Sequence, residues 1–138
     1  MVPDFVPLYS LVIVLFSLLY FFMASIPFLF VSLEVSEVWQ LFRGLFRVYF
    51  WLVGGTSLLA AVVFAASGRF AFTAAMLLLA ATAMAVRRTV LERIDTQQSA
   101  WQSGDPAAMR RLRAIHWGGM LVNIVILATV ASSVRFIL

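Results

Sequence analysis

Long apolar runs alternate with polar segments along this chain, and the pattern predicts four helices. The runs extend from about residue 7 to 33, 48 to 66, 70 to 86 and 117 to 137. An α-helix rises about 1.5 Å per residue and about 20 apolar residues span a bilayer core, so each run suits a membrane span. We therefore expect an all-α integral membrane four-helix bundle, one transmembrane domain over residues 1–138.

The connections between the first three runs predict how the spans are joined. Ser67-Gly68-Arg69 is so short that the second and third spans should be antiparallel neighbours. Residues 34–47 are amphipathic, which indicates an interfacial turn of helix. Pro27 predicts a kink inside the first run. The N-terminus has no basic region of the kind that opens a secretory signal, so we expect the first run to be retained.

The third connection, residues 87–116, is the most polar part of the chain. Its apolar residues keep a helical period on both sides of a break at residues 103–105. Asp105 is a good N-cap there, and Pro106 suits the first helical position. We expect the third and fourth helices to continue out of the membrane as a cytoplasmic helical hairpin roughly 20 Å long.

Charge fixes the expected orientation. The chain is 64% hydrophobic and 12% charged, and its ten basic residues are all arginine. The two longer connections, 34–47 and 87–116, hold Arg43, Arg47, Arg87, Arg88, Arg93, Arg110, Arg111 and Arg113. The positive-inside rule then places both connections in the cytoplasm and both termini outside, in a membrane such as the bacterial inner membrane. Tryptophans near predicted span ends or in the cytoplasmic extension are typical interfacial anchors: Trp39, Trp51, Trp101 and Trp117.

Composition also narrows the chemistry. The absence of cysteine excludes disulfides, thiolate metal sites, iron–sulfur clusters and thiol catalysis. No catalytic or nucleotide-binding motif occurs, and no basic stripe with interleaved aromatics indicates nucleic acid. None of the predicted spans contains an acidic residue, which counts against an autonomous ion-coupled transporter. We therefore expect no enzymatic activity.

Small residues recur at helical spacing in the last three spans. We interpret them as sites of close helix packing within the bundle, because small side chains let backbones approach. A flat pocket for a pigment, quinone or lipid tail is the alternative. The residues are Gly54, Gly55, Ser57, Ala61, Ala65, Ala71, Ala75, Ala81, Ala85, Gly118, Gly119, Ala128 and Ser132.

The sole histidine, His116, and Asn123 lie seven residues apart, which places them on one helix face. They are the candidate cofactor-binding residues. One reading makes His116 an axial ligand to haem or chlorophyll, or a proton relay, with Asn123 beside it. The other makes His116 an interfacial hydrogen-bonding residue and Asn123 an interhelical tie.

Two stretches carry a family resemblance. Residues 41–50, Leu-Phe-Arg-Gly-Leu-Phe-Arg-Val-Tyr-Phe, resemble the start of the second helix in a family of small four-helix membrane proteins of unknown function. That family includes transmembrane protein 205 of animals and short bacterial relatives. Arg111-Leu112-Arg113 followed by His116 and Asn123 resembles the start of its last helix, although Trp117 stands where a glycine is expected. The resemblance implies a four-helix architecture and no particular reaction.

These observations favour a non-enzymatic accessory subunit that packs in the lipid against a larger respiratory or photosynthetic type of membrane complex. The sequence requires no cofactor. A carrier or oxidoreductase that binds haem, pigment, quinone or lipid through His116 is one alternative, and a small oligomeric transporter is another.

Overall fold

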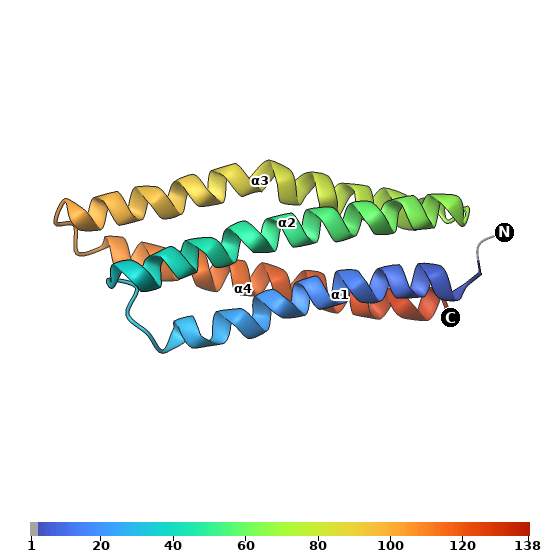
Figure 1. Cartoon of the computed structure of the whole chain (residues 1–138), viewed down its shortest axis with the longest axis horizontal. Helices are drawn as coiled ribbons and strands as arrows, with labels where there is room; N and C mark the ends of the chain where they lie inside the picture. The colour runs from blue at the N-terminus through green and yellow to red at the C-terminus, as the bar shows by residue number, and fades with distance from the viewer. Residues whose placement is uncertain (1–2) are drawn as a thin grey trace.

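The computed structural model describes residues 3–138, and within them the chain forms four α-helices and two short 3-10 helices. They are α1 (Phe5–Ser25), η1 (Ile26–Leu29), α2 (Ser36–Ala66), α3 (Phe70–Gln102), α4 (Ala108–Ser133) and η2 (Val134–Phe136). Successive helices run antiparallel, and both chain ends lie at the same end of the bundle (Figure 1). Each helix packs against its neighbours in the order α1–α2–α3–α4, and α4 closes the ring against α1. The all-α prediction is confirmed, and all four helices are long and apolar enough to cross a membrane.

The first helix is shorter than predicted. The first span was expected to reach residue 33, but α1 ends at Ser25 and a 3-10 helix carries the chain to Leu29. Pro27 explains the difference, because proline has no N–H to donate and its ring clashes with the carbonyl of the residue four positions earlier, Met23. The expected kink is therefore a helix end.

The second helix begins earlier than predicted. Residues 34–47 were expected to form a separate interfacial turn, but α2 starts at Ser36 and continues without a break to Ala66. The amphipathic segment is thus the first three turns of α2. Only a short irregular connection joins it to η1.

Two serine–glycine pairs end α2 and α3 in the same way. Gly68 and Gly104 have positive φ angles of 71° and 93°. At both places the residue after the glycine donates its N–H to a carbonyl five residues back, from Arg69 to Phe64 at 2.9 Å and from Asp105 to Ala100 at 3.0 Å. This is the Schellman pattern, in which glycine takes the left-handed conformation that other residues avoid. Both predicted breaks are confirmed.

The start of α4 differs from the prediction by two residues. The regular helix begins at Ala108 and not at Pro106. The N-cap is Ala107 and not Asp105, which was predicted to cap the helix. The Asp105 carboxylate accepts the backbone N–H of Ala107 at 3.0 Å, in a turn just before the helix. The predicted extension of the third and fourth helices beyond the apolar spans follows from the unbroken course of α3 from Phe70 to Gln102.

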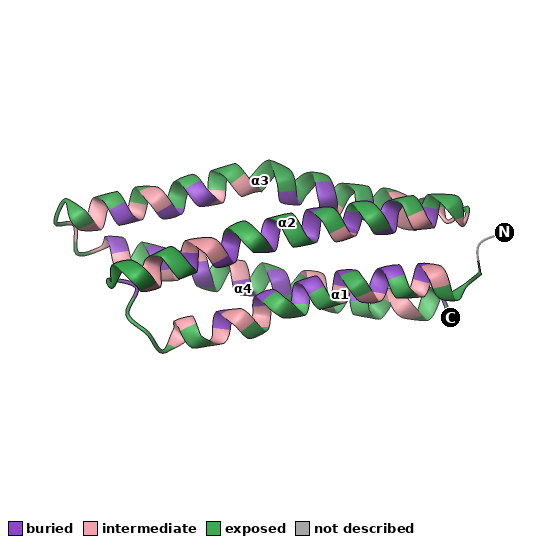
Figure 2. Ribbon diagram, viewed as in Figure 1, coloured by how far each residue is buried: buried purple, intermediate pink, exposed green. Residues whose placement is uncertain are grey.

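Aromatic side chains of α2 fill the centre of the bundle. Phe42 and Phe46 are buried, with ring centroids 5.1 Å apart, and Phe46 also meets Phe21 of α1 edge-on at 5.2 Å. The buried residues follow one side of α1 and α2, whereas most of the surface of α3 and α4 is exposed (Figure 2). In the most apolar window of each helix, 44% of the α2 residues are buried and only 17% of the α3 residues. The two helices that extend beyond the apolar spans, α3 and α4, are therefore also the two most exposed helices of the bundle.

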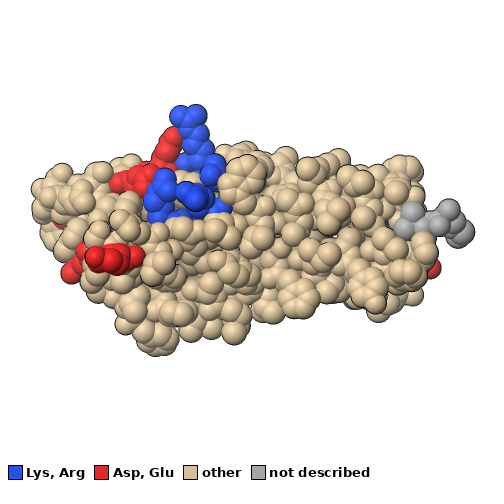
Figure 3. Space-filling model, in the orientation of Figure 1, with Lys and Arg blue, Asp and Glu red and all other residues tan. Residues whose placement is uncertain are grey.

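Charged side chains gather toward the end of the molecule that holds the α3–α4 turn (Figure 3). The visible surface between this charged zone and the opposite end is almost free of charge (Figure 3). This distribution matches a protein whose uncharged band lies in a bilayer.

Candidate functional site

The contact between α1 and α4 positions the predicted site residues. The Asn123 amide nitrogen donates to the Leu18 carbonyl at 3.0 Å. Ten residues earlier on α4, Arg113 donates to the carbonyls of Phe28 and Val31, at the exposed end of η1. The pairs 18–123 and 28–113 define one antiparallel register, and that register places Ser25 level with His116.

His116 is fully buried in an aromatic setting. Its ring meets Phe42 edge-on at a centroid distance of 5.3 Å and Phe28 at 6.3 Å. Neither ring nitrogen has a hydrogen-bond partner within residues 3–138, and the same holds for the Ser25 hydroxyl and the Asn123 amide oxygen. His116 and Asn123 therefore share a buried face of α4, where apolar groups surround the histidine.

This arrangement limits the chemistry of His116. A planar macrocycle could reach a ring nitrogen only if Phe28 or Phe42 moved away, because the imidazole has no exposed surface. In the described part of the chain, no cluster of three histidine, cysteine or acidic residues is close enough to hold a metal. Of the two predicted site residues, only Asn123 makes a side-chain hydrogen bond within residues 3–138. Its bond to the Leu18 carbonyl joins α4 to α1 as an interhelical tie.

The arginines of the charged zone fall into paired and free groups. Arg43 forms a two-pronged ion pair with Asp95, at 2.7 Å and 3.1 Å, and thereby joins α2 to α3. Arg88 pairs with Glu92 one turn along α3. Arg87 lies over the Trp51 ring, 5.1 Å from its centroid. Three arginines of the charged zone are exposed and have no acidic partner among the described residues: Arg47, Arg93 and Arg110.

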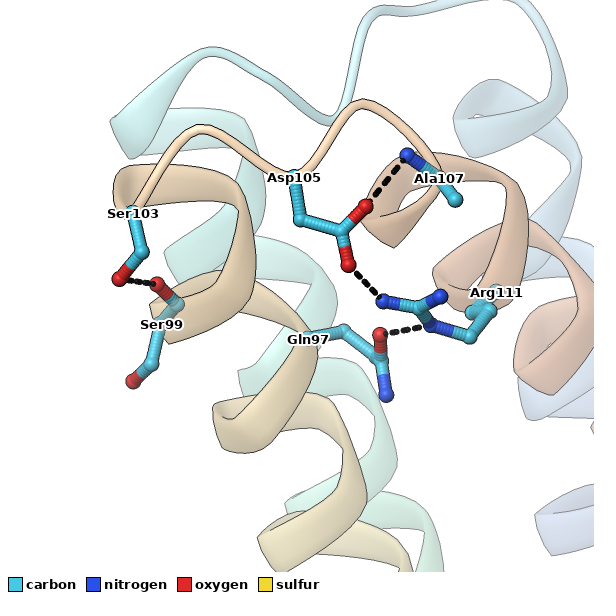
Figure 4. A network of polar contacts seen from close by, with 6 residues as sticks. All are labelled: Gln97, Ser99, Ser103, Asp105, Ala107 and Arg111. Carbon is cyan, nitrogen blue, oxygen red and sulfur yellow. Dashed lines mark hydrogen bonds and ion pairs between the residues drawn. The ribbon is translucent and has the colours of Figure 1, made fainter.

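A polar network closes the α3–α4 turn (Figure 4). Arg111 donates to the side-chain oxygen of Gln97 at 2.6 Å and forms an ion pair with Asp105. The Arg111 guanidinium, with the backbone N–H of Ala107, holds the pKa of Asp105 below its usual value. The turn is therefore fixed by contacts that need an ionised Asp105.

The four tryptophans lie in the charged zone or beside it. Trp51 and Trp117 are exposed, as interfacial anchors should be. Trp39 and Trp101 are half-buried, and the Trp39 indole nitrogen is buried without a partner in the described chain.

The small residues divide into two sets. Gly54, Ser57 and Ala61 are buried, and a Cβ at Gly54 would lie 2.5 Å from the end of Met84 of α3. A Cβ at Gly119 would lie 3.0 Å from Phe46. These four lie at close contacts inside the bundle. The other small residues are exposed in the structure: Gly55, Ala65, Ala71, Ala75, Ala81, Ala85, Gly118, Ala128 and Ser132. Helical spacing identifies a shared face but not the direction in which that face points.

Sequence reasoning offered a flat pocket against small residues as an alternative, and the structure has a groove between α3 and α4 that Gly118 and Gly119 help to line. The groove has a volume of about 560 Å³ and is almost entirely apolar. Its floor is a helical stripe of α2, Phe46, Tyr49, Phe50 and Val53, and its walls include Val86 and Val90 of α3 and Gly118, Gly119 and Val122 of α4. The signal available in the sequence was the Gly118-Gly119 pair, which leaves one wall without side chains. His116 and Asn123 do not line this groove.

The antiparallel bundle, its apolar band and its charged end define a small helical protein of the integral membrane class. Comparisons of the chain with models of known families, with curated proteins and with solved structures gave no match. The resemblance to the transmembrane protein 205 family therefore stays a prediction.

Proposed function

We propose that this protein is a non-enzymatic accessory subunit that binds a larger membrane complex through α3. The observation that supports this proposal is an exposed stripe of four alanines and one leucine on the outer side of α3. Its members are Ala71, Ala74, Leu78, Ala81 and Ala85, and we call them the α3 seam.

The spacing of the α3 seam is that of a helix-pairing surface. Its residues follow one another at steps of three, four, three and four, the heptad pattern by which two helices pack side by side. In a bilayer, where lipid is as apolar as leucine, small residues favour association because the two backbones come close and gain packing contacts. The seam has no helix against it within residues 3–138, so it is suited to a helix of another subunit.

The proposed location is the bacterial inner membrane, with the arginine-rich end in the cytoplasm and both termini outside. The distribution of arginine supports this orientation, because eight of the ten lie in the segments at the α3–α4 turn end.

Purification of the tagged chain in mild detergent, followed by mass spectrometry, tests the proposal. We expect stoichiometric partner subunits with the natural chain. Replacement of both Ala74 and Ala81 by isoleucine should remove them, because two branched side chains hold the helices apart. The matched control is the same replacement at Ala65 and Ala131, which are exposed on other helices and should keep the partners.

Two outcomes would contradict the proposal. A solitary monomer would show that the seam faces lipid. A dimer of this chain alone, disrupted by the Ala74 and Ala81 replacements, would show that the seam pairs two copies instead of binding a complex.

A further inference from the structure

The groove between α3 and α4 has a regular construction along its length. The Arg111–Gln97 hydrogen bond sets the antiparallel register of the two helices. In that register the groove-lining residues face one another in successive pairs: Arg93 with Ile115, Val90 with Gly118, Val86 with Val122 and Thr82 with Ile126. From Arg93 to Thr82 the groove follows α3 for roughly 16 Å, at about 1.5 Å per residue.

The groove is closed at the end near the α3–α4 turn and is open along its side at Gly118. The Gln97–Arg111–Asp105 network joins α3 to α4 one turn beyond Arg93 (Figure 4). At Gly118 a Cβ would meet no atom within 4 Å, so one wall is open space. The groove thus runs from the charged zone into the apolar band of the bundle.

Charge at the mouth of the groove is unbalanced. The three acidic residues of the α3–α4 extension each pair with another arginine: Glu92 with Arg88, Asp95 with Arg43 and Asp105 with Arg111. Arg93 lines the groove, is exposed, and has no acidic partner in the chain from residue 3 onward. An anionic group at the mouth would complement it.

A second polar group lies deeper in the groove. Tyr49 is 7% exposed and lines the groove. Its ring is held from the α1 side by Phe21, at a centroid distance of 4.2 Å. The Arg43–Asp95 pair sets the α2–α3 register and makes Tyr49 level with Thr89, about one helical turn further into the apolar band than Arg93.

We propose that the groove binds one anionic glycerophospholipid. Its phosphate pairs with Arg93, an ester carbonyl one step below accepts the Tyr49 hydroxyl, and one acyl chain lies along Val86 and Val122. A phosphate and an ester oxygen at successive depths match the Arg93 guanidinium and the Tyr49 hydroxyl in that order. This inference does not depend on the α3 seam or on any partner protein.

Charge favours this occupant over a quinone, and the size of the groove suits a ligand. A quinone carries no negative charge and leaves Arg93 without a counterion. A lipid with an anionic head supplies that counterion, and the groove volume of about 560 Å³ lies within the range of about 300–1,000 Å³ usual for ligand pockets.

Native mass spectrometry of the full chain in mild detergent tests the proposal, with phosphatidylglycerol and neutral phosphatidylcholine as probes. We expect one bound phosphatidylglycerol, held about tenfold more tightly than phosphatidylcholine, a difference of about 1.4 kcal/mol. Arg93→Gln should abolish this preference, and Tyr49→Phe should weaken binding of both lipids. Gly118→Leu should fill the groove and remove the bound lipid.

Matched controls separate the groove from general effects of charge and volume. Arg47→Gln removes another exposed, unpaired arginine, and Gly55→Leu adds the same side chain at another open glycine; both should bind as the natural chain does. Equal affinity for the two lipids would overturn the proposal, and so would a phosphatidylglycerol preference that survives Arg93→Gln. Should Gly118→Leu fail to fold, Arg93→Gln and Tyr49→Phe still decide the matter. A retained quinone or polypeptide in place of lipid would also overturn it.

Discussion

At the scale of single residues, His116 and Asn123 show how a polar position in an apolar helix can be used structurally. Asn123 bonds to a backbone carbonyl of α1 and ties the two helices together. His116 has no such bond, and it lies between Phe28 and Phe42 with both nitrogens unpaired in the described chain. A buried polar group without a partner costs about 1–3 kcal/mol. The histidine is therefore a local source of instability if nothing binds it.

We expect His116→Leu to leave the protein as stable as the natural chain or to stabilise it by about 1 kcal/mol. Leucine removes the unpaired nitrogens at similar volume. His116→Gln, which keeps an unpaired amide, should be the less stable of the two variants. Thermal unfolding in mild detergent measures both. A large loss with leucine would mean that a ligand or ordered water binds the nitrogens, and would revive a cofactor role for His116.

The seven-residue spacing was sufficient to predict that His116 and Asn123 share a face of α4. It could not predict the partner helix, because the helical period shows which residues of α4 share a face but not which other helix packs against that face. The role of Arg113 was equally hidden. Its bonds to the Phe28 and Val31 carbonyls exist because the helical course ends near Pro27, which frees those carbonyls.

At the scale of elements, the turns were the most predictable features and the faces the least. Serine–glycine pairs at residues 67–68 and 103–104 mark helix ends, because glycine alone adopts the positive φ angle of the Schellman pattern without strain. The outward direction of Ala71 and Ala85 could not be predicted, since small residues suit an internal contact and a partner contact equally. The position of the α3–α4 groove could not be predicted for a related reason: it depends on three helices at once.

The α3–α4 turn should lose stability in acid through Asp105. Its pKa is lowered in the folded protein, first by the hydrogen bond from Arg111 and then by that from Ala107. Its contribution is therefore fully present above the unfolded carboxyl pKa and is lost as pH falls through the lower folded value.

Thermal unfolding from pH 7 down to pH 3, for the natural chain and Asp105→Asn, measures this contribution. We expect the natural chain to be the more stable at neutral pH, with the difference shrinking as acid protonates the carboxylate. The comparison isolates Asp105, because every other acidic residue is the same in both proteins. A difference that stays constant with pH would mean that the Arg111 contact adds nothing to folding.

At the scale of the whole molecule, the arginine distribution makes a prediction about orientation. The charged end holds the α3–α4 turn, and the opposite end holds both chain ends (Figures 1 and 3). Arginines near span ends are retained on the cytoplasmic side during insertion. Because the chain has no cysteine, a single introduced thiol reports the location of one position without background.

We expect a membrane-impermeant maleimide to label Leu138→Cys in intact cells and Gln102→Cys only after the membrane is opened. Both positions are exposed, so access by the reagent depends on the side of the membrane and not on burial. The opposite labelling pattern would place the arginine-rich end outside, against the charge bias. The phosphate proposed to pair with Arg93 would then belong to a lipid of the outer leaflet. The labelling result therefore decides from which leaflet a bound lipid enters the groove.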